Sequence, residues 1–509
     1  MKLTTTFCSL CALLIPLATI SADDQQGVQA SLADDQQGVQ ASPKILPNIV
    51  IILADDMGYG EVQHLNPKRG KIKTPALDQI AKSGMVFTDA HSGSSVCTPT
   101  RYGLMTGRYA WRTRLQTGVL KGGASLIAKE TLTIAEMLKT KGYDSVMIGK
   151  WHLGMMFDGK QNDKKGAVKP GAKVTHGPLD AAGFDEFYGF HYARQMDLWI
   201  ENDKVTANID AVEMLPKLTK TAVDYIKGRK GNPRPFFMYI PWNSPHSPVV
   251  PSKKWQGKSG LNAHADFVMQ TDNSYGQVIQ ALKDNGFYQN TIVICSSDNG
   301  TSHATSKIKQ LQKAGHFPSG DFRGSKADIW DGGHRVPFLV TWPAKVKPGS
   351  RCQDLVCLTD VIATAAAITG YSFKNKDAPD SFNFLDSLTG KNTNPRADVI
   401  HHSISGRFSI REKQWKLVCC PGSGGWSKPS DGQRMKINGA DSPLNYQLYD
   451  MLQDKEEKTN LSAKHPEVVK RLRALLRKQI DAGRTTPGRK LKNDIPRIIV
   501  DKWRKPTKK

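Results

Sequence analysis

The chain has few cysteines for its length, eight in 509 residues. Two of them, Cys8 and Cys11, lie in a short apolar stretch at the N-terminus, and the others are scattered. This sparse distribution excludes the dense disulfide framework that holds small secreted domains together. Cys352 and Cys357 are the first pair to consider for a disulfide bond, and we expect at least one thiol to stay free.

Hydrophobic runs long enough to cross a membrane are also lacking. The apolar run from Leu10 to Ile20 is too short for a membrane span. Lys2 precedes this run and the small residues Ser21 and Ala22 follow it, which is the pattern of a secretory signal. We therefore expect residues 1–22 to be a signal peptide, no membrane span, and an exported protein that is periplasmic or secreted.

Residues 23–44 have no apolar face. The sequence ADDQQGVQAS at positions 22–31 is repeated at positions 33–42. A polar tandem repeat of this kind cannot bury a core. We expect residues 23–44 to be a disordered leader.

Acidic residues are scarce relative to basic ones, with 47 Asp and Glu against 71 Lys and Arg, and the formal net charge is +24. Such an excess favours anionic partners through long-range attraction. No nucleic-acid-binding motif is recognisable, so we expect no nucleic-acid partner. A sulfated polymer fits an exported protein better. The alternative is a surface that is merely basic, since a basic tail at residues 486–509 supplies part of the excess.

The sequence does contain continuous apolar runs of strand length. Such β-branched runs are typical of strands buried on both faces, and they lie at residues 48–53, 143–148, 236–240, 291–295 and 337–342. Helical patterns alternate with them at residues 74–83, 133–141 and 264–285. This alternation predicts an α/β fold with a large, mostly parallel sheet flanked by helices.

The runs end in polar residues. Those that directly follow a predicted strand are Asp55, Asp56, Lys150, His152, His246, Asp298 and Asn299. In parallel α/β sheets the functional site lies at the carboxyl ends of the strands. These side chains are therefore expected to converge, although they are far apart in the sequence.

Three carboxylates and an amide among these residues form an oxygen-only ligand set, namely Asp55, Asp56, Asp298 and Asn299. Hard oxygen ligands suit Ca²⁺ or Mg²⁺ rather than zinc. Either pair alone is also an ordinary turn or cap sequence. The set predicts a divalent-cation site only if the pairs meet.

The strongest motif is Cys97-Thr98-Pro99-Thr100-Arg101, followed by Thr106-Gly107-Arg108. It resembles the signature of type I sulfatases of the alkaline phosphatase superfamily. The resemblance implies that Cys97 is oxidised to formylglycine (3-oxoalanine) by a formylglycine-generating or anaerobic sulfatase-maturating enzyme. If a helix opens after Pro99, Arg101 lies one turn beyond Cys97 on the same face.

Three further blocks resemble the same family. They are Gly-Lys-Trp-His-Leu-Gly around Lys150 and His152, Pro-His-Ser-Pro around His246, and the block that begins at Lys326, in which Asp331 replaces the usual Glu. The resemblance implies the alkaline phosphatase-like sulfatase fold and one divalent cation, usually Ca²⁺, bound by the oxygen ligands above together with the modified residue 97.

The resemblance also implies hydrolysis of a sulfate monoester. Arg101, Lys150 and Lys326 would hold the sulfuryl oxygens, and a hydroxyl of the hydrated formylglycine would attack sulfur. His246 would protonate the leaving alcohol, and His152 would assist release of sulfate. Export and a basic surface favour a sulfated polysaccharide or glycosaminoglycan fragment as substrate.

Further polar and aromatic residues in expected loops are candidates for substrate recognition, although for each one alone a structural role is the commoner explanation. They are His191, Arg194, Asp197, Trp199, Asn202, His303, His334, His401 and Arg407.

The organisation expected from these patterns is a catalytic α/β domain at residues 45–395 and a smaller C-terminal α+β subdomain at residues 396–485. The latter includes two short strands within residues 401–420 and a basic amphipathic helix at residues 467–482. Two other functions stay open. One is a phosphomonoester or phosphonate-ester hydrolase of the same superfamily, and the other is a non-catalytic binder of sulfated glycans with unmodified Cys97.

Overall fold

The computed structural model describes residues 45–158, 168–391, 394–501 and 503. Residues Leu46–Lys509 form one compact unit, so the boundary expected near residue 395 stays a prediction. The expected signal peptide and leader lie outside the described residues, as does the end of the basic tail. Within the described chain no helix is both long and apolar enough to cross a bilayer.

A ten-stranded mixed sheet forms the centre of the fold. Its five middle strands are parallel, in the order β11 (Thr291–Ser297), β1 (Asn48–Asp55), β10 (Phe236–Pro245), β4 (Asp144–Lys150) and β7 (Glu186–Phe190). Four of the five strands predicted from apolar runs are found here. Because β1 pairs with β10 and β11 on its two edges, its carboxyl end lies in the middle of the sheet.

The edges of the sheet include antiparallel strands, which the sequence patterns did not predict. On one side β12 (Phe338–Thr341) runs antiparallel to β11 and to β2 (Met85–Phe87), and β13 (Ser350–Cys352) completes the edge. On the other side β8 (Leu198–Glu201) and β9 (Lys204–Asn208) form an antiparallel extension. A continuous apolar run predicts a buried strand but not its direction, because direction depends on the connecting chain.

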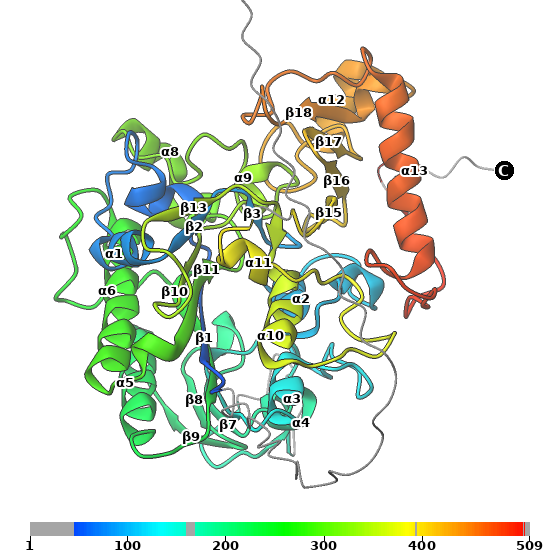
Figure 1. Ribbon diagram of the computed structural model, residues 1–509. Coiled ribbons are helices and arrows are strands. Elements are labelled where there is room, and N and C mark those ends of the chain that lie inside the picture. The colour runs from blue at the N-terminus through cyan, green and yellow to red at the C-terminus, as the bar shows by residue number, and fades with distance from the viewer. Residues whose placement is uncertain (1–44, 159–167, 392–393, 502, 504–509) are drawn as a thin grey trace, which may run out of the picture. The chain divides into compact units, whose positions relative to one another are not determined.

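Helices cover both faces of the sheet (Figure 1). Val50 and Ile52 of β1 face a layer formed by α1 (Pro75–Ser83), α5 (Ala211–Gly228) and α6 (Ala263–Asp284), and they share one apolar core with it. Helices α1 and α6 were predicted at nearly these positions. Asn262 caps α6 by accepting a hydrogen bond from the backbone N–H of Ala265 at 3.0 Å.

The alternate residues of β1 face the opposite layer. Ile49 and Ile51 pack into a second apolar core with α2 (Cys97–Thr106), α3 (Ile134–Lys139) and α10 (Val361–Thr369). Successive strand residues point to opposite faces, so β1 contributes to both cores. Burial on both sides explains why this strand is apolar throughout and not alternating.

The C-terminal part forms a separate antiparallel sheet, whose apolar core also includes Tyr109, Trp111, Ile329 and Trp330 from the rest of the chain. Its strands are β15 (Asp398–His402), β16 (Phe408–Glu412), β17 (Trp415–Val418) and β18 (Gln447–Asp450). Leu472 and Leu476 of helix α13 (Pro466–Ala482) pack against this sheet (Figure 1). The α+β character predicted for this region is present, with three strands, not two, in residues 398–418.

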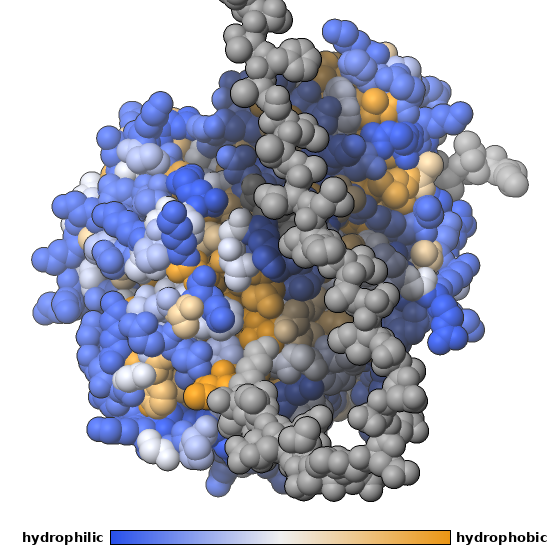
Figure 2. All heavy atoms as spheres, in the orientation of Figure 1, coloured by the Kyte–Doolittle hydropathy of each residue, from blue (hydrophilic) through white to orange (hydrophobic). Residues whose placement is uncertain are grey.

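Shorter elements connect these parts. They are the strands β3 (Ala90–His91), β5 (Met156–Phe157), β6 (Val174–His176) and β14 (Val356–Cys357), and the helices α4 (Pro178–Ala182), α7 (His303–Ser306), α8 (Ile308–Lys313), α9 (Asp331–His334), α11 (Leu385–Leu388) and α12 (Asp431–Asn438). The face of the molecule seen in Figure 2 is mostly hydrophilic, with apolar residues in limited areas.

The disulfide considered for Cys352 and Cys357 is not present. Every cysteine of the described residues is free and buried. Cys352 lies in β13 beside β2, whereas Cys357 lies in β14, which pairs with β3 in a different small sheet. The two thiols are held in separate strands despite their closeness in sequence.

Candidate active site

The polar residues that follow the central strands meet at one end of the sheet, as their positions predict. Asp55 ends β1, Lys150 ends β4, and Asp298 follows β11. The backbone N–H of Asp56 donates to Asp298 Oδ1 at 3.1 Å, which joins the ends of β1 and β11. All four side chains are buried.

Cys97 is the first residue of α2, with Val96 in extended conformation before it and Pro99 in the first turn. Cys97 therefore lies at a helix N-terminus, as predicted, although the helix begins at the cysteine itself and not after Pro99. Cys97 Sγ lies 3.5 Å from Asp55 Oδ1 and 3.5 Å from Lys326 Nζ. The start of a helix carries partial positive charge, which suits an anion at this position.

Buried ion pairs surround Cys97. Lys150 Nζ lies 2.5 Å from Asp55 Oδ2, and Lys326 Nζ lies 2.5 Å from Asp56 Oδ1. We call Asp55, Asp56, Cys97, Lys150 and Lys326 the Cys97 cluster. A single unpaired charge at such depth would cost several kcal/mol, so the pairing is what makes the cluster tolerable.

Arg101 lies beneath the Cys97 cluster. Its guanidinium donates to Asp298 Oδ2 from Nη2 at 2.7 Å and from Nε at 3.1 Å. Nη1 donates to the backbone oxygen of Lys150 at 3.1 Å. Its donors therefore hold the carboxylate and the strand end in place.

Burial and neighbouring charges shift the pKa values of the acidic groups at this site in different directions. Burial would raise the pKa of Asp55, but the positive charge of Lys150, with those of Arg101 and Lys326, outweighs burial and holds this pKa well below its usual range. Burial, followed by repulsion from Asp55, raises the pKa of Asp298 to about 6. Burial, followed by the charge of Asp298, raises the pKa of the Cys97 thiol. The unmodified thiol is thus protonated and a poor nucleophile.

The oxygen ligands predicted for a divalent cation lie together. Asp56 Oδ2 and Asn299 Oδ1 are buried and have no hydrogen-bond partner among the described residues. Ligand atoms of Asp55, Asp56, Cys97 and His246 lie within 4.8 Å of one another. Buried oxygens without a donor fit a hard cation such as Ca²⁺ or Mg²⁺. These four residues could hold a metal ion.

Two histidines flank the cluster. His152 Nε2 lies 2.8 Å from the backbone oxygen of Leu120, and His152 Nδ1 is buried without a partner among the described residues. His246 Nε2 lies 3.7 Å from Asp56 Oδ2. Burial lowers the pKa of both imidazoles, for His152 well below its usual range. Both are therefore predominantly neutral at neutral pH, a form in which one ring nitrogen can accept a proton and the other carries one.

A pocket of about 480 Å³ opens onto the cluster. Its lining is Val96, Cys97, Val119, Leu120, Lys121, His152, Tyr192, Ala193, His246, Ser247, Pro248, Lys326, Ile404 and Trp426. Cys97, Lys326 and the two histidines provide polar groups, whereas much of the remaining wall is apolar. Such a pocket suits a ligand with one anionic group and a less polar remainder.

Comparison with known proteins agrees with this geometry. The sequence profile of the sulfatase family matches residues 47–371, most of the chain. The chain belongs to the sulfatase family. Sulfatases are sulfuric ester hydrolases, so the protein is an enzyme of this class.

Relatives resemble this sulfatase along most of their length. It is 31% identical to an N-acetylgalactosamine-6-O-sulfatase of Bacteroides thetaiotaomicron, over 84% of this chain and 92% of the relative. It is 29% identical to human arylsulfatase A, and the match covers 89% of this chain and 92% of the human protein. A solved structure concerned with the metabolism of multiple glycosaminoglycans by B. thetaiotaomicron has a TM-score of 0.76 at 29% identity, covering 86% of this chain and 99% of that one.

The predicted sulfate-contacting cations of this sulfatase occupy different depths. Lys326 lines the pocket. Lys150 and Arg101 are completely buried and lie below the pocket lining. Lys150 and Arg101 contact the carboxylates of Asp55 and Asp298 instead.

The substrate-recognition candidates lie elsewhere. Of those whose side chains are described, none lines the pocket. His191 is buried behind Tyr192, and Trp199 is buried in β8. Asp197 and His303 are exposed and do not line the pocket. Asn202 accepts a hydrogen bond from the backbone N–H of Phe187. Arg407 pairs with Asp431 at 2.6 Å; Arg194 lies in a 3-10 turn, its side chain outside the description.

His334 and His401 belong to a second buried cluster with His91, here called the histidine cluster. His91 Nδ1 lies 3.0 Å from His334 Nδ1, and the rings of His334 and His401 stack with centroids 3.6 Å apart. Burial lowers the pKa of all three, to about 4 for His91. These residues join β3, α9 and β15 and do not reach the pocket.

Sequence reasoning missed the pocket walls. Tyr192 is the neighbour of a predicted candidate, His191. Trp426 and Ile404 come from the C-terminal part of the chain, and Trp426 directly follows the glycine-rich stretch at residues 422–425. A large aromatic residue after such a loop is the only signal that could have pointed to it.

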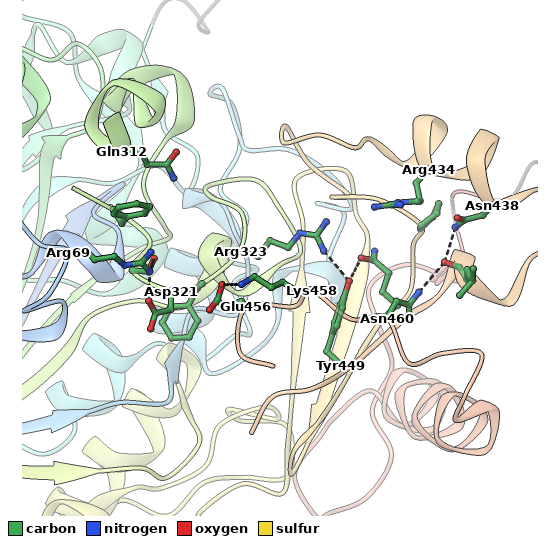
Figure 3. Close-up of a pocket in the computed structure, with 16 residues that line it drawn as sticks. Arg69, Gln312, Asp321, Arg323, Arg434, Asn438, Tyr449, Glu456, Lys458 and Asn460 are labelled. Atoms are coloured by element: carbon green, nitrogen blue, oxygen red, sulfur yellow. Dashed lines mark hydrogen bonds and ion pairs between the residues drawn. The ribbon is translucent and has the colours of Figure 1, made fainter. Parts of the chain in front are cut away.

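A larger cavity of about 600 Å³ lies between the main sheet and the C-terminal sheet (Figure 3). Its charged residues are mostly paired with each other. Arg69 pairs with Asp321, and Lys458 lies 2.5 Å from Glu456. Arg323 donates to the backbone oxygen of Glu457 at 2.7 Å. This cavity contains none of the reactive groups described above.

Proposed function

We propose that this sulfatase hydrolyses sulfate monoesters on sulfated polysaccharide or glycosaminoglycan fragments, using formylglycine at position 97 and a divalent cation. The observation that supports this most is the position of Cys97. It begins a helix at the base of the pocket, 3.5 Å from both a carboxylate oxygen of Asp55 and the ammonium of Lys326.

The cation is proposed to be Ca²⁺, with Mg²⁺ as the alternative. Asp55, Asp56, Asp298 and Asn299 would hold it through oxygen atoms, together with the modified residue 97. Two of these oxygens are buried without a donor, which favours a bound cation. Residue 97, once converted to hydrated formylglycine, would provide a hydroxyl nucleophile, and a cation held by these residues would make that hydroxyl more acidic.

The remaining roles belong to side chains of this chain. Lys326 would contact the sulfuryl oxygens and stabilise the charge that grows on them during attack. Lys150 and Arg101 would keep Asp55 and Asp298 ionised and oriented. His246, on the pocket wall, would give a proton to the leaving alcohol. His152 would accept a proton when sulfate is released.

The saccharide substrate is inferred from charge and from relatives. A net charge of +24 favours a polyanionic substrate. The relative named N-acetylgalactosamine-6-O-sulfatase makes N-acetylgalactosamine 6-sulfate the first saccharide to test. Export through residues 1–22 would place the enzyme in the periplasm or outside the cell, and a maturating enzyme would have to act on Cys97 first.

The test compares sulfate and phosphate esters. The protein is produced with a maturating enzyme and assayed with an aryl sulfate, the matching aryl phosphate and a panel of sulfated monosaccharides. We expect sulfate release that exceeds phosphate release and that is abolished in Cys97→Ala. Cys295→Ala is the matched control, because Cys295 is equally buried in β11 but far from the pocket lining.

Each other outcome has a definite meaning. Faster turnover of the phosphate would favour the phosphatase or phosphonate-ester alternative. Absence of any turnover, with retained saccharide binding, would favour a non-catalytic glycan binder. Full activity in Cys97→Ala would contradict the proposed chemistry.

A further inference from the structure

Trp426 is placed unusually for a large aromatic residue. Its side chain is 54% exposed, and among the described residues it is the only aromatic one in the exposed class. It belongs to none of the three apolar cores found in the described chain. It does line the pocket that contains Cys97 and Lys326. Its place in the wall of this pocket leaves the indole ring available to a ligand bound beside Cys97.

The backbone of Trp426 is fixed to the loop that carries Lys326. Asp328 Oδ1 accepts hydrogen bonds from the N–H groups of Trp426 and Ser427, both at 2.9 Å. The other oxygen of Asp328 accepts from the N–H of Ser325 at 2.9 Å. The buried carboxylate of Asp328 thus connects the segment that contains Lys326 to the segment that contains Trp426.

The glycine before Trp426 tightens this connection. A Cβ atom at Gly425 would lie 2.3 Å from the backbone oxygen of Ala327, so a side chain there would force the two segments apart. Ile404 also joins the Lys326 loop, because its N–H donates to the same Ala327 oxygen at 3.2 Å. The backbone of Trp426 is therefore held close to the loop that carries Lys326, whose ammonium is proposed to bind sulfate.

The walls around the indole indicate the chemistry of its ligand. Val119, Leu120 and Pro248 line the same pocket and are apolar. A sulfated sugar has the complementary form, because its sulfate is anionic while one face of a pyranose ring consists largely of C–H groups. An indole covers such a face with large contact area at small conformational cost.

We propose that Trp426 is the stacking platform for the pyranose ring that carries the sulfate ester. This inference rests on the sulfatase function proposed above. In this arrangement the main sheet supplies the sulfate chemistry, and the C-terminal part of the chain supplies recognition of the sugar through Trp426 and Ile404.

The kinetic test uses Trp426→Ala and Trp426→Phe in matured enzyme. For the sulfated monosaccharide that the wild type turns over fastest, we expect kcat/KM to fall about tenfold or more in Trp426→Ala, as for tryptophan side chains that become buried on binding. Trp426→Phe retains a ring and should recover most of the loss. Inhibition by inorganic sulfate, which has no sugar, should keep the wild-type inhibition constant in both variants.

The control variant is Leu452→Ala, which removes another exposed apolar side chain that does not line the pocket. It should match the wild type in every assay. If kcat/KM of Trp426→Ala for the saccharide stayed within twofold of the wild-type value, the proposal that Trp426 stacks on the sugar ring would be refuted. A parallel weakening of sulfate inhibition would also overturn it, because Trp426 would then act only by supporting Lys326.

A binding experiment separates failure of the platform from failure of the proposed function. Calorimetric titration of Cys97→Ala with the same sulfated monosaccharide, or with N-acetylgalactosamine 6-sulfate if the wild type turns over none, requires no turnover. Binding that is lost in Cys97→Ala/Trp426→Ala supports the platform even if the wild type shows no sulfatase activity. Equal binding by the two variants, or no binding by Cys97→Ala, would overturn the platform whatever the activity.

Discussion

The Cys97 cluster and the histidine cluster are both buried groups of titratable side chains. The Cys97 cluster includes two lysines paired with carboxylates, and the histidine cluster lies beside Lys416, which pairs with Asp331 and Glu457. The two clusters differ in access and in charge. The Cys97 cluster opens to a pocket and pairs each of its two lysines with a carboxylate. The histidine cluster is closed, and burial keeps its imidazoles neutral.

The two clusters differ also in how their polar atoms are directed. Asp56 and Asn299 leave buried oxygens without donors at the base of the pocket. In the histidine cluster the rings of His334 and His401 lie nearly parallel, 13° apart, with their centroids 3.6 Å apart. Imidazole binds metal through a lone pair in its ring plane, so two stacked rings cannot direct lone pairs at one ion. Proximity of histidines alone therefore does not indicate a metal site.

The largest effect is expected on stability in the histidine cluster. Lys416 Nζ lies 2.7 Å from Asp331 Oδ1 and 2.8 Å from Glu457 Oε1, and none of these side chains is exposed. Lys416→Met would leave the buried carboxylate of Glu457 without a cation, while Asp331 would keep only Arg335 at 3.1 Å, and the free energy of unfolding should fall by about 3–5 kcal/mol. Urea unfolding measures this.

The control for Lys416 is Lys391→Met, which removes a surface ion pair with Asp386. Exposed pairs contribute about 0–1 kcal/mol. If both variants unfolded at the same urea concentration, the importance of burial in this cluster would be refuted. The folded fraction of Lys416→Met should keep its activity per molecule.

In the Cys97 cluster the main effect is expected on activity. Lys326→Met removes the ammonium that lines the pocket beside Cys97, and kcat/KM for a sulfate ester should fall by about 10²–10³-fold. Steady-state kinetics on folded, matured protein measures the loss. The matched variant is Lys121→Met, since Lys121 lines the same pocket but is exposed, and it should lose far less. If kcat/KM fell equally in both variants, the location of the Lys326 ammonium next to Cys97 would have no special importance.

Calcium should stabilise the protein by binding at the Cys97 cluster and not at the histidine cluster. A cation that binds only the folded protein stabilises it by about 2.7 kcal/mol at a free concentration one hundred times Kd. We expect calcium to raise the unfolding free energy of wild type and of His401→Gln. Asn299→Ala, which removes a buried oxygen without a donor, should lose most of this increment. An unchanged increment in Asn299→Ala would place the cation elsewhere.

Acid should weaken the histidine cluster. Burial, followed by the charge of Arg335, lowers the pKa of His91 to about 4, whereas the unfolded chain takes up this proton near its ordinary pKa. The stabilisation is therefore complete above the ordinary range and is lost as pH falls toward 4. Between about pH 7.5 and about pH 5 the contribution of His91 should fall by about 2 kcal/mol.

Unfolding measured at both pH values in His91→Asn should show a correspondingly smaller acid loss. His303→Gln, which replaces an exposed histidine, should follow the wild-type curve. The idea fails if His91→Asn loses as much stability in acid as the wild type.

The sequence predicted those parts of the site that depend on strand ends. Asp55, Lys150 and Asp298 each follow a continuous apolar run, and parallel central strands necessarily bring such ends together. The antiparallel edge strands were not predictable, because an apolar run carries no direction. The calcium ligands and the formylglycine remain predictions that rest on family resemblance and on the donor geometry.

The partners of the histidines and the pocket walls were beyond sequence reasoning for another reason. His334 and His401 are polar residues beside recognisable blocks, which suggests exposure, but their burial results from contact with His91, hundreds of positions away in the sequence. Trp426 reaches the pocket only because Asp328 fixes its loop beside Lys326. Such contacts depend on how the C-terminal sheet packs, which no local pattern encodes.

The most direct test of the account is the mass of the peptide that contains residue 97, measured in a preparation whose sulfatase activity is known. Conversion of the thiol to the aldehyde lowers the residue mass by about 18 Da. We predict that specific activity rises in proportion to the fraction of peptide with the lower mass. Full sulfatase activity in a preparation whose peptide is entirely unmodified cysteine would contradict the account.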